Sequence, residues 1–99
     1  MVRLAKVVRS SDPKKKFTAI FDDGTRVHFG GRGYGDYILH TKRSGRDFAK
    51  AKRAAYIARH SKGGENWKNA KSPGALSRWI LWEYPTLEKA VRLYNSHFR

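Results

Sequence analysis

Large apolar side chains are concentrated in residues 72–84, which hold two of the three tryptophans of the chain. Ser72 is a favourable N-cap and Pro73 a favourable first helical residue, because the cap hydroxyl accepts a hydrogen bond from an unpaired backbone N–H and proline has no N–H. Leu76 and Ile80 follow at the spacing of one helix face. The pattern predicts a helix that Ser72 caps and that is buried on most of its circumference.

The first 30 residues show the patterns of β-strands. We expect a first strand at residues 4–9, and the β-prone runs 17–22 and 25–29 flank an Asp-Gly pair, which is typical of a hairpin. Residues 30–35 contain four glycines and are predicted to be a loop that cannot continue a strand. Their spacing matches neither the dinucleotide-binding nor the Walker pattern. An alternative is that these glycines bring backbone N–H groups close to phosphate, with Arg32 beside them.

Two more helices follow from the remaining pattern. Residues 46–60 hold no glycine or proline and are rich in alanine, and we expect Phe48 and the alanines at 51, 55 and 58 to face a partner element. Pro85 ends the tryptophan-rich helix, and Thr86 caps a last helix. Its core-facing residues are Leu87, Ala90, Val91, Tyr94 and Phe98. The fold class is α+β: a single domain over residues 1–99, with a small N-terminal antiparallel sheet of about three strands packed with about three C-terminal α-helices.

Charge suggests the class of partner. The chain has 22 Lys and Arg against 8 Asp and Glu, a formal charge of +14, yet its 13% aromatic content indicates a folded domain. A polyanion would relieve the repulsion, so nucleic acid is the first candidate, an anionic membrane surface the second and an acidic protein the third. The chain has no cysteine, which excludes disulfides, and no apolar run long enough to cross a bilayer, so we expect no membrane insertion.

The excess charge is greatest in residues 40–71. Cations crowded along this segment are expected to share one surface and to bind phosphate, which positions a protein without reading sequence. The candidates in this segment are Lys42, Arg43, Arg46, Lys50, Arg53 and Arg59. Further candidates are Lys14, Lys15 and Lys16 in the loop after the first strand, Arg32, and Arg78 in the tryptophan-rich helix.

Aromatic residues offer a second way to contact nucleic acid. We expect Tyr34, Tyr37 and Trp67 in loops, where rings would stack on single-stranded bases, and Trp79 and Trp82 in the core. For Trp67 a satellite of the core is an equal alternative. The sequence leaves open DNA against RNA and single against double strand.

The sequence gives little support for catalysis. The four histidines have no metal-ligand spacing, and turns and helix ends explain most carboxylates, so we predict no enzyme, no metal and no cofactor. Asp36, His40, His60 and Glu65 form the one conceivable polar group. Its alternatives are a nuclease centre and a structural network, with Arg59, that ties the glycine loop to the basic helix.

Several short motifs together resemble a known viral family. The residues that carry the resemblance are Asp36, Tyr37, His40, residues 56–60, Glu65, Asn66, Trp67, Gly74 and residues 76–82. They are similar to those of short basic proteins encoded by large double-stranded DNA viruses of amoebae and algae, the mimivirus and marseillevirus relatives. About half of the chain is covered. Residues 41–45 depart from the family pattern, because here this link is longer and basic.

The resemblance implies a virion protein packaged with the genome, located in the virion and, during infection, in the host cytoplasm or nucleus. Our leading hypothesis is nonspecific DNA binding for genome packaging or early infection. The alternatives are a scaffolding virion protein that neutralises DNA or acidic capsid proteins, a protein that recruits host or viral transcription machinery, and a nuclease. A homodimer would double the basic surface, but the sequence does not indicate its interface.

Overall fold

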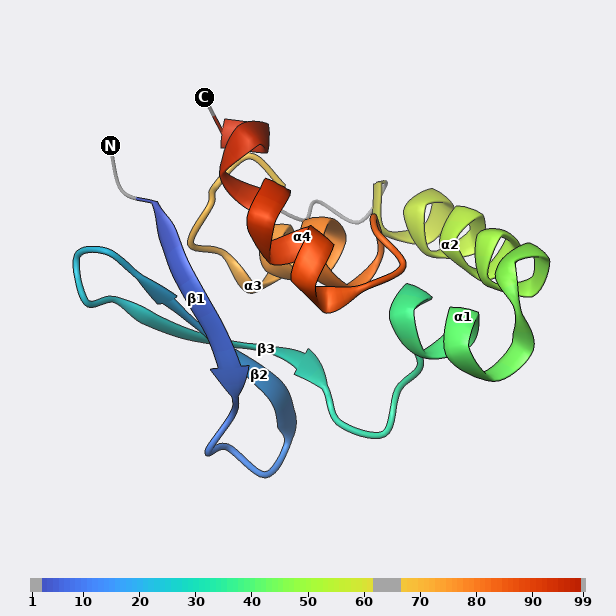
Figure 1. The fold of residues 1–99 in the computed structure, drawn as a ribbon, viewed down its shortest axis with the longest axis horizontal. Helices are drawn as coiled ribbons and strands as arrows, with labels where there is room; N and C mark the ends of the chain where they lie inside the picture. Colours follow the sequence, from blue (N-terminus) through green and yellow to red (C-terminus); the bar gives the residue numbers. More distant parts are fainter. Residues whose placement is uncertain (1–2, 62–66, 99) are drawn as a thin grey trace.

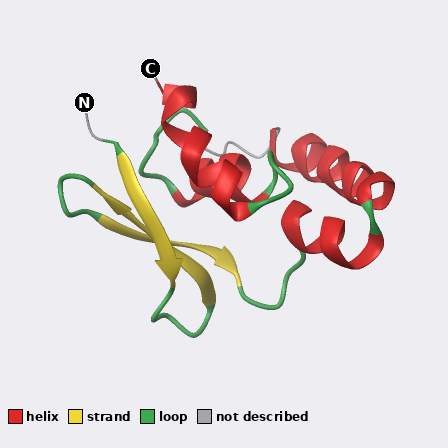
Figure 2. Ribbon diagram, viewed as in Figure 1, coloured by secondary structure: helices red, strands yellow, loops and turns green. Residues whose placement is uncertain are grey.

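The computed structural model describes residues 3–61 and 67–98, and it begins with an antiparallel meander (Figure 1). Strands β1 (Leu4–Arg9), β2 (Lys15–Phe21) and β3 (Arg26–Gly31) follow one another in the sheet in chain order. The three predicted strands are therefore confirmed. The α+β class is confirmed as well, because the described elements that follow the sheet are helices joined by loops (Figure 2).

Strand β3 extends into the glycine-rich residues 30–35, beyond the end that the sequence pattern predicted. Lys15 pairs with Gly31, so the first two glycines of residues 30–35 belong to the sheet and the prediction that they form a loop is wrong. Gly30 has a φ of 78°, and a Cβ atom there would lie 2.9 Å from Cδ1 of Leu81. Glycine is needed at this position because a helical segment passes directly against the strand.

A helical hairpin follows the sheet. Helix α1 (Tyr37–Ser44) begins at Asp36, whose side chain accepts a hydrogen bond from the Leu39 N–H, and it ends at Gly45 with a φ of 87°. The sequence analysis did not predict α1. Helix α2 (Arg46–Ser61) packs against it and confirms the helix predicted at residues 46–60.

The buried side of α2 differs from the expectation. Ala49 and Tyr56 are buried, whereas the alanines at 51, 55 and 58 are exposed and Phe48 is 46% exposed. The prediction that these small residues face a partner is wrong. Larger side chains, Arg53 and Tyr56, make the contacts instead, through an ion pair and ring stacking described below.

The tryptophan-rich segment forms α3 (Pro73–Leu76) and a π-helical turn, η1 (Ser77–Leu81). Ser72 caps α3 as predicted, since its hydroxyl accepts a hydrogen bond from the Ala75 N–H over 3.0 Å. Helix α4 (Leu87–Tyr94) and the 3-10 turn η2 (Asn95–Phe98) complete the described chain. Of the two predicted core tryptophans, Trp82 is buried and Trp79 is partly buried.

One hydrophobic cluster joins the sheet to α3, η1 and α4. Phe29 of the sheet, Leu76 and Ile80 of the central helical segment, and Tyr94 of α4 are all fully buried. Figure 1 shows α3 and α4 next to the sheet and the α1–α2 hairpin at the other end of the long axis. This arrangement places α2 across a hollow from the ends of β2 and β3.

Candidate nucleic-acid interface

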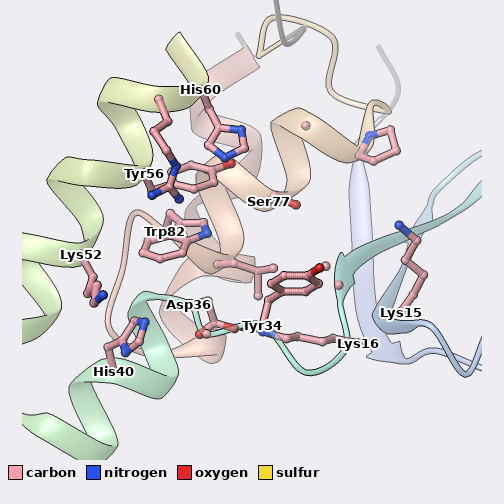
Figure 3. Close-up of a pocket in the computed structure, with 17 residues that line it drawn as sticks. Lys15, Lys16, Tyr34, Asp36, His40, Lys52, Tyr56, His60, Ser77 and Trp82 are labelled. Atoms are coloured by element: carbon pink, nitrogen blue, oxygen red, sulfur yellow. Dashed lines mark hydrogen bonds and ion pairs between the residues drawn. The ribbon is translucent and has the colours of Figure 1, made fainter. Parts of the chain in front are cut away.

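A hollow of about 670 Å³ lies between the sheet and the helical hairpin (Figure 3). The ends of β2 and β3 supply one side, and α1, α2 and η1 supply the other. Its cations are Lys15, Lys16, Lys52 and Arg59, its imidazoles are His40 and His60, and its rings are Tyr34, Tyr56 and Trp82. We call it the aromatic hollow.

A second hollow of about 460 Å³ adjoins the first. Besides Lys16, which lines both hollows, its cations are Arg9, Arg32 and Lys42, one each from β1, the loop after β3, and α1. Its apolar lining consists of Phe17, Ile38, Leu39 and Leu87. We call it the apolar hollow, and we call the two together the basic groove.

An ion pair separates the two hollows and lines both of them. Nζ of Lys16 lies 2.6 Å from Oδ2 of Asp36, and the two side chains are 13% and 4% exposed. The other carboxylate oxygen of Asp36 accepts the Leu39 N–H at 2.9 Å. Asp36 therefore caps α1, neutralises Lys16 and fixes the helical hairpin to the sheet.

The other six cations of the groove lie outside ion-pair distance of any carboxylate in the described part of the chain. They are Arg9, Lys15, Arg32, Lys42, Lys52 and Arg59. Arg32 donates to the backbone carbonyl of Lys15 over 3.2 Å, which holds its guanidinium group beside the sheet.

Two predicted phosphate contacts are engaged inside the protein instead. Arg53 donates from Nε to the carbonyl of Trp82 and pairs with Glu83 at 2.5 Å, while Arg78 is buried and pairs with the same carboxylate at 2.7 Å. Arg78 also stacks over the ring of Trp79 at 4.2 Å. Burial alone would raise the pKa of Glu83, but the hydrogen bonds from Arg78 and Arg53 outweigh it and lower the pKa. Both arginines have a structural role here.

The cations of α2 do not form the single surface that was expected. Lys52 and Arg59 are seven residues apart, so they lie on the same side of the helix, and both line the aromatic hollow. Lys50 is about 200° away from Lys52 around the helix, because each residue adds about 100°. Arg46, four residues before Lys50, lies on that other side. The exposed Lys14 and Arg43 also lie outside the two hollows.

The rings of the aromatic hollow form an ordered wall. Tyr56 stacks on Trp82 with 4.5 Å between centroids and 8° between planes, and His60 stacks on Tyr56 at 4.3 Å. Tyr34 lies on the opposite, sheet side and is 77% exposed. Tyr34 lies in a loop as expected, whereas Tyr37 is a buried residue of α1, so its predicted loop position is wrong.

The polar group suggested by the sequence is assembled in part. Asp36, His40, Arg59 and His60 all line the aromatic hollow, while Glu65 lies outside the described residues. Trp67 packs against the core, with the Arg78 guanidinium 5.3 Å from its ring, in agreement with the satellite alternative.

Neither the geometry nor the comparisons below point to a catalytic activity. In residues 3–61 and 67–98, no three His, Asp or Glu side chains are grouped so that they would hold a metal ion. The same residues contain no helix that is long and apolar enough to span a membrane.

The sequence analysis overlooked two cations of the groove, Arg9 and Lys52. The seven-residue spacing between Lys52 and Arg59 was a usable signal, because it places both on one side of a helix. For Arg9 no local signal exists. It reaches the groove only because β1 lies beside β2 in the sheet.

Comparison with known proteins gives a family and no close relative. No curated protein and no solved structure matches the chain. A family profile matches residues 5–60, which include the sheet, α1 and nearly all of α2. The match therefore covers residues of all three strands and of helices α1 and α2, which supply part of the lining of the basic groove. The chain belongs to DUF5754, a family of unknown function.

Proposed function

We propose that this protein binds DNA through the phosphate backbone, with little sequence specificity, in the basic groove. The observation that carries the proposal is the set of six groove cations, none of which has a carboxylate partner among the described residues. Cations held in a concave surface concentrate positive potential and attract a polyanion. Contacts to phosphate carry no sequence information, so affinity is expected to vary little between sequences.

The contrast with cations elsewhere supports this proposal. Lys71 pairs with Asp23 at 2.6 Å, and Glu83 accepts both Arg53 and Arg78. Asp23 and Glu83 thus neutralise cations at the hairpin turn and near the core, away from the groove. Among the described cations of the groove, only Lys16 has a carboxylate partner, Asp36.

Charge reversal in the aromatic hollow tests the proposal. The variant Lys15→Glu, Lys52→Glu, Arg59→Glu is expected to weaken binding to a short DNA duplex at least about 100-fold at 100 mM salt. The wild-type affinity should fall with salt with a log–log slope of roughly −5 if all six cations contact phosphate, and the variant slope should be shallower by about 3. Fluorescence anisotropy with a labelled duplex across a salt series measures both quantities.

A matched control carries the same change in charge outside the groove. Lys6, Arg26 and Arg92 are exposed and have no ion pair in the described part of the chain. Changing all three to Glu should reduce affinity far less. Equal losses in the two variants would show that the charge acts without an organised surface, as in the scaffolding alternative. Arg53 is left unchanged, because its replacement would break the pair with Glu83.

Association with a virion, dimerisation and recruitment of transcription machinery all stay predictions. A wild-type protein that binds neither duplex nor single strand, yet captures a protein partner after nuclease treatment, would favour the recruitment alternative over DNA binding.

A further inference from the structure

We propose that the aromatic hollow binds one unstacked nucleotide of single-stranded DNA, with its base against Tyr34 and its flanking phosphates on Lys15, Lys52 and Arg59. The inference rests on the proposed function and makes it more specific, because it names the form of DNA and the residue that contacts a base.

Tyr34 is positioned as a contact surface and not as part of the core. The residue is 77% exposed, the largest value among the exposed large hydrophobic residues of the described chain. It lies over Gly31, where a Cβ atom would come within 2.7 Å of the Cδ2 atom of the ring. The Tyr34 N–H also donates to the Gly31 carbonyl over 3.3 Å. The tight turn and the glycine therefore hold the ring flat against the backbone, with much of its surface open to solvent.

The other rings of the hollow are already covered. Tyr56 is 5% exposed and Trp82 is 9% exposed, because they stack on each other, His60 stacks on Tyr56, and His40 lies tilted beside Trp82. Among the tyrosine and tryptophan rings that line the hollow, only Tyr34 offers an accessible face. A base has the flat apolar face that such a ring binds, and stacking of this kind tolerates any base.

The charge and size of the hollow fit the rest of a nucleotide. Figure 3 shows Lys15 and Lys16 on the side of Tyr34 and Lys52 on the opposite side. Arg59 lies on the side of Lys52, about two turns further along α2. Among the described residues of the lining, Asp36 is the one carboxylate, and its charge is offset by Lys16 and by the Leu39 N–H. The volume of about 670 Å³ lies within the range of small-molecule sites.

A base in a duplex cannot use this site without leaving its neighbours. Unstacking and unpairing cost a few kcal/mol for each base, whereas the bases of a single strand are already available. The adjoining cations Arg9, Arg32 and Lys42 would contact the phosphates of the same strand beyond the nucleotide in the hollow. The groove is therefore expected to use base stacking for a single strand and phosphate contacts alone for a duplex.

The test compares Tyr34 variants on two probes, a fluorescein-labelled 12-mer of thymidylate and a labelled 12-base-pair duplex. Tyr34→Ala should weaken binding to the single strand by about 5- to 140-fold, the range expected for the loss of one stacked base. Binding to the duplex should change by less than about twofold. Tyr34→Phe should retain single-strand affinity because it keeps the ring, and Tyr34→Leu should lose it because it keeps only the bulk. Since Tyr34 is so exposed, all three variants should unfold at the wild-type temperature.

Two further measurements identify the ligand. A thymidylate 12-mer with a central 5-iodouracil should photocrosslink to Tyr34, as located by peptide mass spectrometry. Thymidine monophosphate should compete only at concentrations far above those of the oligonucleotide. Competition at similar concentrations would overturn the assignment to a strand and indicate a site for free nucleotides.

The outcomes separate this inference from the proposed function. If Tyr34→Ala leaves single-strand affinity unchanged, or weakens both probes equally, the nucleotide site is wrong, while salt-dependent duplex binding would still support the basic groove. If neither probe binds to the wild-type protein, the proposed function itself fails.

Discussion

Glu83 determines the roles of two arginines on separate helical elements. Its carboxylate accepts Arg53 from α2 and Arg78 from η1, so neither guanidinium is available to a phosphate in the way the sequence suggested. The side chain of Arg78 is 11% exposed and that of Glu83 is 22% exposed, which is buried enough for loss of one partner to be costly. Whether Arg53 binds phosphate or has a structural role thus depends on Glu83, which lies 30 positions further along the chain.

His97 makes the stability of the protein sensitive to mild acid. Its ring stacks on Trp79 at 4.0 Å, and its Nε2 lies 2.9 Å from the hydroxyl of Tyr84. Burial lowers the pKa of His97 below the ordinary value of 6.5. The unfolded chain therefore binds a proton at a higher pH than the folded protein does, and stability falls as the pH drops below about 6.5.

Thermal unfolding between pH 7.5 and pH 5.5 checks this prediction. The melting temperature of the wild type should fall more steeply with decreasing pH than that of His97→Gln, which has no titrating group at this position. The carboxylates Asp23 and Glu83, whose pKa values are lowered, lose their contributions only at still lower pH. Parallel slopes for the two proteins would contradict the assignment to His97.

The side chain of Asp36 both caps helix α1 and attaches it to the sheet. The carboxylate caps the helix and pairs with Lys16 of β2, so local helix formation and attachment to the sheet depend on the same group. This explains why α1 forms although it has only eight residues and has no acidic residue in its first turn.

Two substitutions separate these roles of Asp36. Asp36→Asn keeps the cap and removes the ion pair, and we expect it to lower the free energy of unfolding by about 3 kcal/mol, because the Lys16 ammonium group is left partly buried without its counter-charge. Asp36→Ala removes both, and a loss of about 4 kcal/mol is expected. Thr86→Ala, which removes a cap with no ion pair, is the matched control and should lose about 1 kcal/mol. Urea denaturation measures all three losses.

The Asn variant also affects the basic groove, because it releases the charge of Lys16. Its duplex affinity should therefore increase, with a salt slope steeper by about 1. If Asp36→Asn binds DNA less tightly than the wild type while remaining folded, the groove does not run past this ion pair.

The elements that could be predicted from the sequence were those whose formation is indicated by residues next to one another in the chain. The Asp-Gly turn, the Ser72 cap and the glycine-free run of α2 all depend on neighbouring residues, and the corresponding elements formed. The extension of β3 depends on pairing of Gly31 with Lys15 of β2, and the residue that caps α1 is held by Lys16 of the same strand. A single sequence does not show such contacts.

The same distinction applies to the candidate site. Most of its cations were predicted, since charge can be read directly from composition. Which cations lie together could not be predicted, because it depends on which side of α2 is buried. That side was misassigned: alanine spacing suggested one side, whereas stacking of Tyr56 on Trp82 and the Arg53 ion pair select another.

Across the whole molecule, the formal charge of +14 opposes compaction. Only four ion pairs are present in residues 3–61 and 67–98, so repulsion between exposed cations outweighs local attraction. Added salt screens long-range repulsion more than it weakens partly buried pairs.

This balance predicts that salt stabilises the protein. Raising NaCl from 20 to 300 mM should increase the melting temperature by about 5 °C, which corresponds to about 1 kcal/mol for a domain of this size. The control variant with Glu at positions 6, 26 and 92 has a formal charge of +14 − 6 = +8 and should respond less. Scanning calorimetry in one buffer measures both proteins, and a melting temperature that falls with salt in the wild type would contradict the argument.

The side chain of Asn95 joins η2 to the first strand. It accepts the Leu4 N–H at 2.8 Å and donates to the Leu4 carbonyl at 3.1 Å. Contacts between residues 91 positions apart form late, because closing such a long loop costs entropy before any contact forms. We therefore expect β1 to pair with β2 first, and the contact between Leu4 and Asn95 to form only after Asn95 has been synthesised. Until then the N–H and C=O groups of Leu4 on the outer edge of β1 lack this partner, and such unpaired strand groups can pair with other chains.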